Sequence, residues 1–379
     1  MDAAATSGYG NIDDIIVDTM TIAMRDSWLN PSSLYAANVK NKINRCRENV
    51  AKFINAQPEE IYYTSGGSES NSWAIQGFIN QCFSEYKRPC IITSTIEHKS
   101  IIECANNLNR VDVTYVNVDE YGFVNIEKLR KVMLEKASNN YKMLVSIQLA
   151  NNEVGTIQDL KAIAEEVHRF NGVLHTDAVQ AFGHIPIDVK DLDVDLMSVS
   201  AHKISPVLRG IGFLYKKNGI NIQPLIYGSQ ESGLRGGTTN TYGIIGLNKA
   251  LEYCDISQKK IDEMRKKRDY FVNLLECKFD CELNGDSYYR LPNNINVTFS
   301  QSITGEALLY MLDISNIKIS TGSACNSNVI EPSYVLKAIG LSDEEAMKAI
   351  RISIPDNITY KDIDKTIDEI GKVIKLIEA

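Results

Sequence analysis

Between residues 60 and 215 the sequence alternates short apolar runs with segments of helical periodicity. In one such segment Ile75, Phe78, Ile79 and Cys82 recur three and four positions apart, as on one face of a helix. This alternation is typical of a mostly parallel sheet with helices on both faces. The expected strands are 90–95, 111–118, 143–149, 172–176, 195–200 and 211–215, and the expected helices are 69–83, 98–108, 125–136 and 159–170.

The order of elements changes after about residue 255. A charged helical segment near 257–275 comes first, and a terminal helix carries Ile363, Ile367, Ile370 and Ile374 on one stripe. Between them lie short apolar segments at 294–299, 306–312, 316–320 and 350–354. We therefore expect a large α/β domain over 13–255 and a small α+β domain over 256–379, which also includes residues 1–12. Ligand sites of such folds lie at strand carboxyl ends and between domains.

The chain has 379 residues, a formal charge of −8 and 44% hydrophobic residues. This acidic balance argues against an obligate nucleic-acid binder, so no direct nucleic-acid partner is expected. No apolar run reaches the length of a membrane span, and the start of the chain lacks the features of a secretion signal. The eight cysteines show no paired spacing. We expect a cytoplasmic protein with no membrane partner and no metal site.

Lys203 and Asp177 each follow an apolar stretch that is typical of a buried strand. Pyridoxal phosphate requires such a pair, because the lysine holds its aldehyde as a Schiff base and the carboxylate keeps its pyridine nitrogen protonated. Each residue also has a plainer interpretation, as a surface lysine and a turn residue. A carboxylate that emerges from an apolar strand favours a cationic partner, and Gln180 follows closely behind it.

A turn rich in glycine and serine, residues 64–70, opens the expected helix 69–83. Gly66 and Gly67 let backbone amides approach an anion, and the helix N-terminus adds the positive end of its dipole. Ser65 and Ser68 carry hydroxyls suited to a phosphate. The alternative is an ordinary turn capped by Ser68, so the segment indicates a site for a single phosphate at most.

Three further polar residues stand at or within expected strands. His98 follows strand 90–95, where an imidazole is suited to stacking on a cofactor ring and to acid–base chemistry, although an exposed histidine at a helix start fits equally well. Asn152 follows strand 143–149 and is either part of a polar turn or an amide that orients a ring hydroxyl. Arg351 is a lone cation in an apolar strand, and such an arginine pairs with a carboxylate of the protein or of a substrate.

Cys325 lies in a stretch of small polar residues, 320–327, with no apolar partner to bury it. Reactive thiolates are found at exposed loop cysteines of this kind. The alternative is an incidental surface thiol.

Together these residues resemble the cysteine desulfurases of the NifS/IscS type, which are fold-type-I pyridoxal-phosphate enzymes of the class-V aminotransferase family. The resemblance runs over nearly the whole chain and rests on many short motifs in the family's order. These motifs are 30–34, 64–66 with 69–71, 97–99, 151–155, 175–180, 200–203, 230–238 and 322–325. It implies the fold of that type, a mostly parallel central sheet with helices on both faces and a smaller α+β domain.

The resemblance also implies how the cofactor would be held. Lys203 would bond to pyridoxal 5'-phosphate, and His98 would stack on its ring. Asp177 would bind the pyridine nitrogen, with Gln180 and Asn152 near the ring hydroxyl and the substrate. The phosphate would be bound by Gly67, Ser68, Ser200 and His202 and, from the second subunit of a homodimer, by Thr238.

The same resemblance implies the reaction. Arg351 would clamp the carboxylate of L-cysteine, and the Cys325 thiolate would take its sulfur and release L-alanine. The resulting persulfide would pass to an acceptor protein for iron–sulfur cluster assembly or for tRNA or DNA thiolation. The catalytic residues would thus be Lys203, Cys325 and His98.

Three segments depart from the family pattern, at 2–6, 205–210 and 353–356. The asparagine that the family carries near its N-terminus is missing from the first, and the second is one residue longer than usual. Two alternatives therefore stay open: a selenocysteine lyase on the same scaffold, and a non-catalytic sulfur-transfer scaffold.

Overall fold

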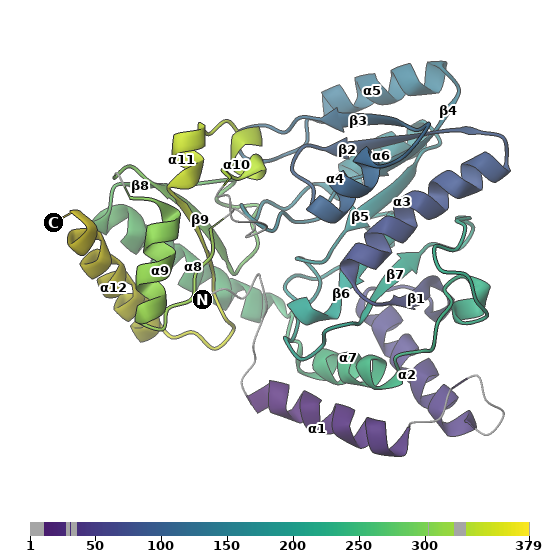
Figure 1. Cartoon of the computed structure of the whole chain (residues 1–379), viewed down its shortest axis with the longest axis horizontal. Helices are drawn as coiled ribbons and strands as arrows, with labels where there is room; N and C mark the ends of the chain where they lie inside the picture. The colour runs from purple at the N-terminus through teal and green to yellow at the C-terminus, as the bar shows by residue number, and fades with distance from the viewer. Residues whose placement is uncertain (1–10, 28–30, 32–35, 302, 322–330, 379) are drawn as a thin grey trace.

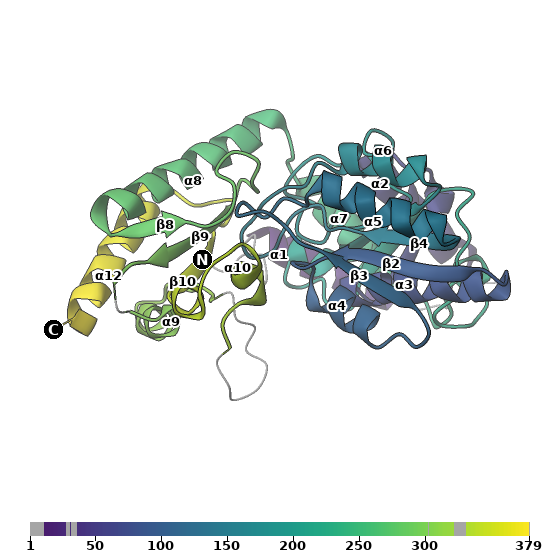
Figure 2. The same ribbon diagram turned by 90° about the horizontal axis from the view of Figure 1, so that it is seen from above.

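The computed structural model describes residues 11–27, 31, 36–301, 303–321 and 331–378, which form two lobes (Figures 1 and 2). The first lobe has a large sheet between helices, and the second has a small sheet with helices packed against it. Within the described part of the chain, no helix combines the length and the apolar character that a membrane span requires.

The large sheet has seven strands in the order β1-β7-β6-β5-β4-β2-β3. Neighbours from β3 to β6 pair in parallel, whereas β7 pairs antiparallel with both β6 and β1. The strands are β1 (Ile61–Thr64), β2 (Arg88–Ser94), β3 (Asp112–Val116), β4 (Tyr141–Ser146), β5 (Val173–Asp177), β6 (Leu196–Ser200) and β7 (Gly212–Lys216). Because β2, β4, β5 and β6 run in one direction, their carboxyl ends meet at one edge of the sheet.

Helices cover both faces of this sheet, and each face has its own buried core. Val39, Leu129 and Leu247 belong to the core on one face, while Trp73 and Ile101 belong to the core on the other. The helices of this lobe are α1 (Asn11–Asp26), α2 (Ala37–Phe53), α3 (Gly67–Ser84), α4 (Lys99–Asn106), α5 (Ile126–Ser138), α6 (Leu160–Arg169) and α7 (Thr241–Tyr253). Short 3₁₀ turns lie at Pro58–Glu60, Ala201–Lys203 and Glu231–Gly233.

The six expected strands are confirmed as β2 to β7, and the four expected helices as α3 to α6. The sequence interpretation did not include β1, which is an edge strand of four residues. It also left out α1, α2 and α7, although Val39, Ile43, Cys46 and Val50 recur at helical spacing in α2 and are buried. The fold class, a mostly parallel sheet flanked by helices with a smaller α+β part, is confirmed.

The second lobe is built on a three-stranded antiparallel sheet in the order β10-β9-β8. Its elements are α8 (Gln258–Lys278), β8 (Cys281–Leu283), β9 (Asn294–Phe299), α9 (Gly305–Ile314), α10 (Tyr334–Ala338), α11 (Asp343–Met347), β10 (Ala349–Ser353) and α12 (Tyr360–Glu378). Its core combines residues from 264 to 374, among them Phe271, Val297, Ile352 and Ile367. This separate core supports the predicted domain division at residues 255 and 256, which stays a prediction.

Candidate active site

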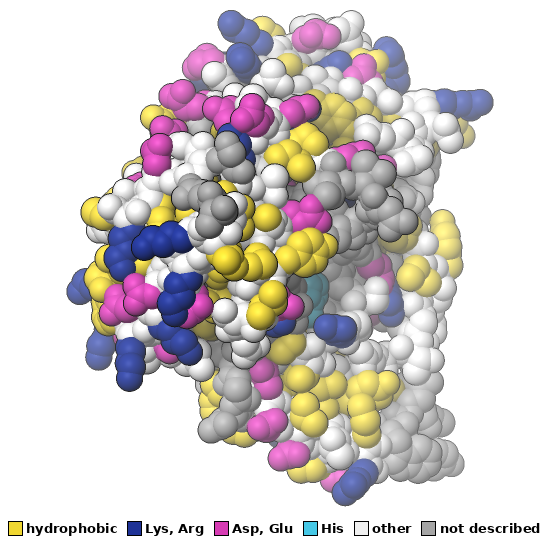
Figure 3. Space-filling model, turned by 60° about the vertical axis from the view of Figure 1, so that its left-hand side comes forward, with side chains coloured by type: hydrophobic (Ala, Val, Ile, Leu, Met, Phe, Trp, Pro, Cys, Tyr) yellow, Lys and Arg dark blue, Asp and Glu magenta, His cyan; other side chains and the backbone are white. Residues whose placement is uncertain are grey.

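A cavity of about 220 Å³ lies at the carboxyl ends of β2, β4, β5 and β6 and extends to β10 of the second lobe. It brings together most of the residues that the sequence singled out. Its lining includes Gly67, Ser68, His98, Asn152, Asp177, Gln180, Ser200, His202, Lys203 and Arg351. In a space-filling view, a histidine side chain is visible in a recess of the surface (Figure 3). The structure thus brings these residues together in one place, while their individual roles stay predictions.

Lys203 lies in the 3₁₀ turn that follows β6. Two residues of the same turn region face each other, because Ser200 Oγ and His202 Nδ1 are 2.7 Å apart. Burial, and then the positive charge of Lys203, lowers the pKa of His202 to about 4. The neutral imidazole therefore offers a hydrogen bond beside the lysine without a second positive charge at pH 7.

Asp177 ends β5 and is buried, with 6% of its surface exposed. Its Oδ1 accepts from the amide of Val179 at 2.9 Å, and its Oδ2 accepts from Nδ2 of Asn71 at 2.7 Å. Hydrogen bonds of this kind compensate a carboxylate for its loss of water and fix its direction. Asn71 is a residue that the sequence interpretation quoted in a motif without giving it a role.

Helix α3 points its N-terminus at the same cavity, which Gly67 and Ser68 line. Gly66 adopts φ 152°, a conformation that L-residues rarely take, and this places the first amides of the helix at the cavity. A Cβ at Gly67 would stand 2.6 Å from Cγ2 of Val179, so the helix start and the segment after β5 are in close contact. Ser68 does not cap this helix, since the N-cap is Gly66 and makes no side-chain hydrogen bond. The first amides of a long helix form a site for an anion.

His98 is the N-cap of α4 and holds a defined orientation. Its Nδ1 accepts from the amide of Ser100 at 3.1 Å and lies 2.8 Å from Ser100 Oγ. Because Nδ1 is the acceptor, the neutral ring carries its proton on Nε2. Ser100 Oγ in turn accepts from Asn71 at 2.9 Å, so Asn71 links His98 to Asp177.

Arg351 in β10 reaches across from the second lobe, and its NH1 donates to the backbone carbonyl of Asn152 at 3.0 Å. It is buried, with 8% exposed. The side-chain Oδ1 of Asn152 is also buried and has no hydrogen-bond partner among the described residues. A buried acceptor without a partner at a cavity wall indicates that a ligand group supplies the missing donor.

Glu97 and Glu153 are buried carboxyls next to this wall, which the sequence interpretation did not assign. Burial raises the pKa of Glu97 to about 8 and that of Glu153 to about 7. Their only sequence signal was their place beside His98 and Asn152 in the family motifs. In the described residues, no three His, Cys, Asp or Glu side chains form a group that could hold a metal ion.

Two predicted site residues are not among the described residues that line this cavity. Cys325 lies outside the described residues, as do the whole family motif 322–325 and all of 30–34 except residue 31. Thr238 lines a different cavity of about 100 Å³, together with Ser65 and Arg235. Its predicted contact with the phosphate of a second subunit stays a prediction.

Comparisons with known proteins identify the family of the chain. The class-V aminotransferase family matches residues 1–366. "Cysteine desulfurase IscS" of Clostridium botulinum (strain Hall) is 42% identical over 369 residues, which cover 95% of this chain and 91% of the relative. The protein of the same name from Methanosarcina thermophila is 40% identical over 371 residues, covering 95% and 88%.

Solved structures resemble the whole chain as well. A "NIFS-LIKE PROTEIN" has a TM-score of 0.89 at 33% identity and covers 99% of this chain and 98% of its own. A structure titled "SspA in complex with cysteine" has a TM-score of 0.79 at 33% identity, covering 94% and 99%.

The chain therefore belongs to the class-V aminotransferase family, whose members are pyridoxal-phosphate enzymes. Within that family its relatives are the NifS/IscS-type proteins, as the sequence motifs indicated.

The cavity fits pyridoxal phosphate on the chemistry of its groups. It offers an amine at Lys203, a carboxylate at Asp177, an imidazole at His98 and an unpartnered acceptor at Asn152. The N-terminus of α3 supplies the amides that a phosphate requires. The predicted cofactor is thus supported by the family and by the donor set.

Proposed function

We propose that this protein removes sulfur from L-cysteine, releases L-alanine and carries the sulfur as a persulfide on Cys325. The activity class, a pyridoxal-phosphate-dependent cysteine desulfurase, is confirmed by the relatives of nearly full length. The observation that supports the proposal is the common cavity lined by Lys203, Asp177 and Arg351. Their amine, carboxylate and guanidinium are suited to the cofactor aldehyde, its pyridine nitrogen and the substrate carboxylate.

The cofactor supplies an aldehyde that bonds to amines and a ring that draws electrons from the substrate. Lys203 would hold the aldehyde, and its free amine would move protons at the substrate α-carbon. Asp177 keeps the proton on the pyridine nitrogen, and Asn71 keeps that carboxylate in place. His98 also lines the cavity, where its imidazole would stack on the ring and exchange protons through Nε2.

The remaining lining residues orient the cofactor and the substrate. Asn152 would accept a hydrogen bond from the ligand through its buried Oδ1, which has no partner among the described residues, and Gln180 lines the same cavity. Arg351 binds the substrate carboxylate through its guanidinium. The phosphate ligands in this proposal are Gly67, Ser68, Ser200 and His202.

Cys325 acts as the sulfur acceptor in this proposal. Its thiolate attacks the sulfur of the substrate, so that a sulfur–sulfur bond forms as the carbon–sulfur bond breaks. The electron pair of the broken bond stays on the β-carbon, which takes up a proton and leaves as part of alanine. The persulfide then passes to a protein thiol or to a reductant.

We extend the proposal to the assembly and the place of action. The active unit is a homodimer in which Thr238 of one subunit completes the phosphate site of the other, which is supported by the separation of Thr238 from the cavity of its own chain. The sulfur acceptor is a scaffold or thiolation protein of the cytoplasm. The described cysteines are free thiols, in keeping with a reducing compartment.

The test uses purified protein with L-cysteine and a reductant, and it measures alanine and sulfide. The wild type is expected to form both in equal amounts, and Cys325→Ala is expected to form neither. Cys277→Ala, which removes an exposed free thiol, serves as the matched control and keeps full activity. A Cys325→Ala variant that retains turnover on selenocysteine alone would instead identify a selenocysteine lyase, and a wild type that forms no alanine contradicts both.

A further inference from the structure

The loop that carries Asn152 is held by the second lobe at several points. Arg351 donates to the carbonyl of Asn152 at 3.0 Å, and the hydroxyl of Ser333 donates to Oε2 of Glu153 at 2.5 Å. Two asparagine side chains of β9 donate to the carbonyl of Glu153 at 3.2 and 3.3 Å. The position of this loop therefore depends on groups from β9, β10 and the start of α10.

The segment that carries His98 is held in the same way. The hydroxyl of Tyr334 donates to the backbone carbonyl of Glu97 at 2.6 Å, one residue before His98. The carboxyl of Glu97 is fully buried and is bound in turn by Ser94 Oγ and by the amide of Gln148 at 2.9 Å. A shift of Tyr334 is thus passed directly to the peptide that precedes the imidazole.

An apolar cluster lies directly beside these hydrogen bonds and joins the same segments. Ile96 and Val154, each next to one of the two glutamates, pack with Val335 and Leu336 of α10. All four side chains are fully buried. Helix α10 therefore packs in a small core shared by the two lobes. The hydrogen bonds made by the hydroxyls of Ser333 and Tyr334 lie next to this core.

We infer that Tyr334 and Ser333 are positioning residues: their hydroxyls set His98 and Asn152 at the distances from Arg351 that the reaction requires. Tyr334 acts on His98 through the backbone of Glu97, and Ser333 acts on Asn152 through the side chain of Glu153. The inference rests on the proposed function, because it assigns these residues to the wall that binds cysteine and the cofactor ring. Neither residue lines the cavity itself.

The first test is Tyr334→Phe, which removes one oxygen and keeps the apolar ring in place. We expect kcat to fall about tenfold with the KM for cysteine changed less than about twofold, since His98 is displaced while Arg351 stays. Tyr288→Phe is the matched control, because Tyr288 is 73% exposed, and it is expected to leave kcat unchanged.

A second readout does not depend on turnover. Hydrogen exchange of the holoenzyme should become faster in residues 96–101 of Tyr334→Phe and stay unchanged in α6, whose buried residues belong to the core of the large sheet. The absorbance of the bound cofactor should show full occupancy in both variants. Unchanged kcat together with unchanged exchange in 96–101 would overturn the role of Tyr334.

The role of Ser333 is tested by a cycle of Ser333→Ala, Glu153→Gln and the double variant. We expect each single variant to raise the KM for cysteine about fivefold, because the Asn152 loop loses its anchor, and the double variant to be no worse than the singles. Additive effects would show that the two residues do not act through their mutual contact, and this would overturn the inference.

The outcomes separate this inference from the proposed function. If the wild type forms no alanine, the proposed function fails while the exchange experiment still reports on the anchoring. If the wild type is active and Tyr334→Phe matches it in kcat and in exchange, the proposed function stands and the inference fails.

Discussion

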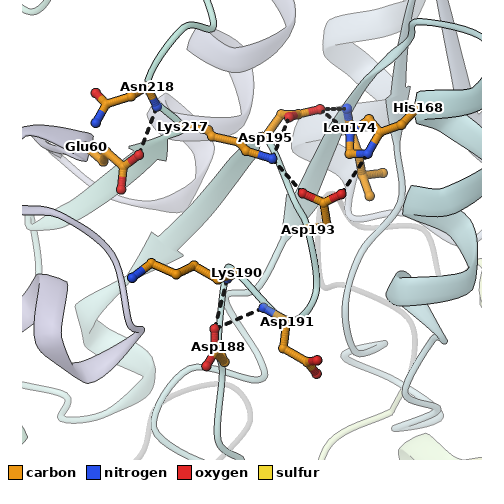
Figure 4. Close-up of polar contacts among 10 residues, drawn as sticks. All are labelled: Glu60, His168, Leu174, Asp188, Lys190, Asp191, Asp193, Asp195, Lys217 and Asn218. Carbon is orange, nitrogen blue, oxygen red and sulfur yellow. Dashed lines mark hydrogen bonds and ion pairs between the residues drawn. The ribbon is translucent and has the colours of Figure 1, made fainter.

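Charged groups lie at both ends of strand β6, but those at one end line a cavity and those at the other end bind one another. At the carboxyl end, Ser200, His202 and Lys203 line a cavity. At the other end, Asp195 accepts from the amide of Leu174 at 2.8 Å and from His168 at 2.9 Å (Figure 4).

The charges of this second end satisfy one another. Asp193 binds the other ring nitrogen of His168 at 3.0 Å and the ammonium of Lys217 at 2.6 Å. These contacts tie α6 and the end of β7 to the turn before β6.

The two ends of this strand therefore serve different purposes, ligand binding at one end and stability of the fold at the other. Polar groups that pair with one another stabilise the fold, whereas polar groups around a cavity are available to a ligand. Substitutions at the carboxyl end of β6 should therefore affect activity, and substitutions at its other end should affect the free energy of unfolding.

The largest effect is expected from Lys203→Ala. Removing the amine that we propose holds the cofactor should lower the rate of alanine formation by at least about 10³-fold. Lys217→Ala, at the opposite end, is the control and should keep its kcat while its melting temperature falls. Comparable losses of activity in both variants would contradict the separation of the two ends.

The next largest effect concerns Asp177 and its partner. Asp177→Asn should lower kcat about 10²-fold, because the pyridine proton loses its counter-charge. Asn71→Ala should lower it about tenfold, because the carboxylate loses one hydrogen-bond donor. The measurement is steady-state alanine formation at full cofactor occupancy. An Asn71→Ala variant with wild-type kcat would contradict the role of Asn71 in positioning Asp177.

A change of stability without a change of kcat is expected from Asp195→Asn. The substitution weakens the contacts of a buried carboxylate with His168 and with the amide of Leu174, and it should lower the free energy of unfolding by about 2–3 kcal/mol. Urea denaturation of the folded enzyme, with kcat measured on the same sample, checks this. A fall in kcat with no change in the urea midpoint would show that Asp195 serves activity and not stability, which contradicts the difference between the two ends of β6.

The smallest effect concerns the middle of β6, where Ser198 Oγ lies 2.9 Å from Nε2 of His175. Burial lowers the pKa of His175 to about 3. The unfolded chain therefore binds a proton below pH 6.5 that the folded chain does not, and stability is lost as the pH falls from about 6.5 towards 3.

This one group should account for about 2 kcal/mol of lost stability between pH 7 and pH 5. In His175→Gln the urea midpoint should depend less on pH over this range, although the variant is less stable at pH 7. An identical pH slope in the wild type and the variant would contradict a buried neutral imidazole.

The sequence predicted the sheet well because its strands are nearly continuous apolar runs. It predicted the shared location of Lys203, Asp177, His98 and Arg351 because strand ends and family motifs both pointed there. It did not predict β1, whose four residues carry little pattern of their own and which is placed by antiparallel pairing with β7.

The supporting residues of the site were harder to find. Asn71, Glu97 and Glu153 act on other side chains through hydrogen bonds between elements that are distant in the sequence. The spacing of residues along the sequence does not indicate such a contact, because the contact depends on how α3 and α10 pack. The family motifs contained all three residues, but a motif alone does not say which neighbour a side chain meets.

The close contact between Gly67 and Val179 has a consequence for the history of the chain. A methyl group at position 67 would collide with a γ-methyl of Val179, and valine has few rotamers in which to retreat. A larger residue at position 67 is thus expected only in lineages where position 179 has already changed. An alanine at the first would persist only where the second has become smaller.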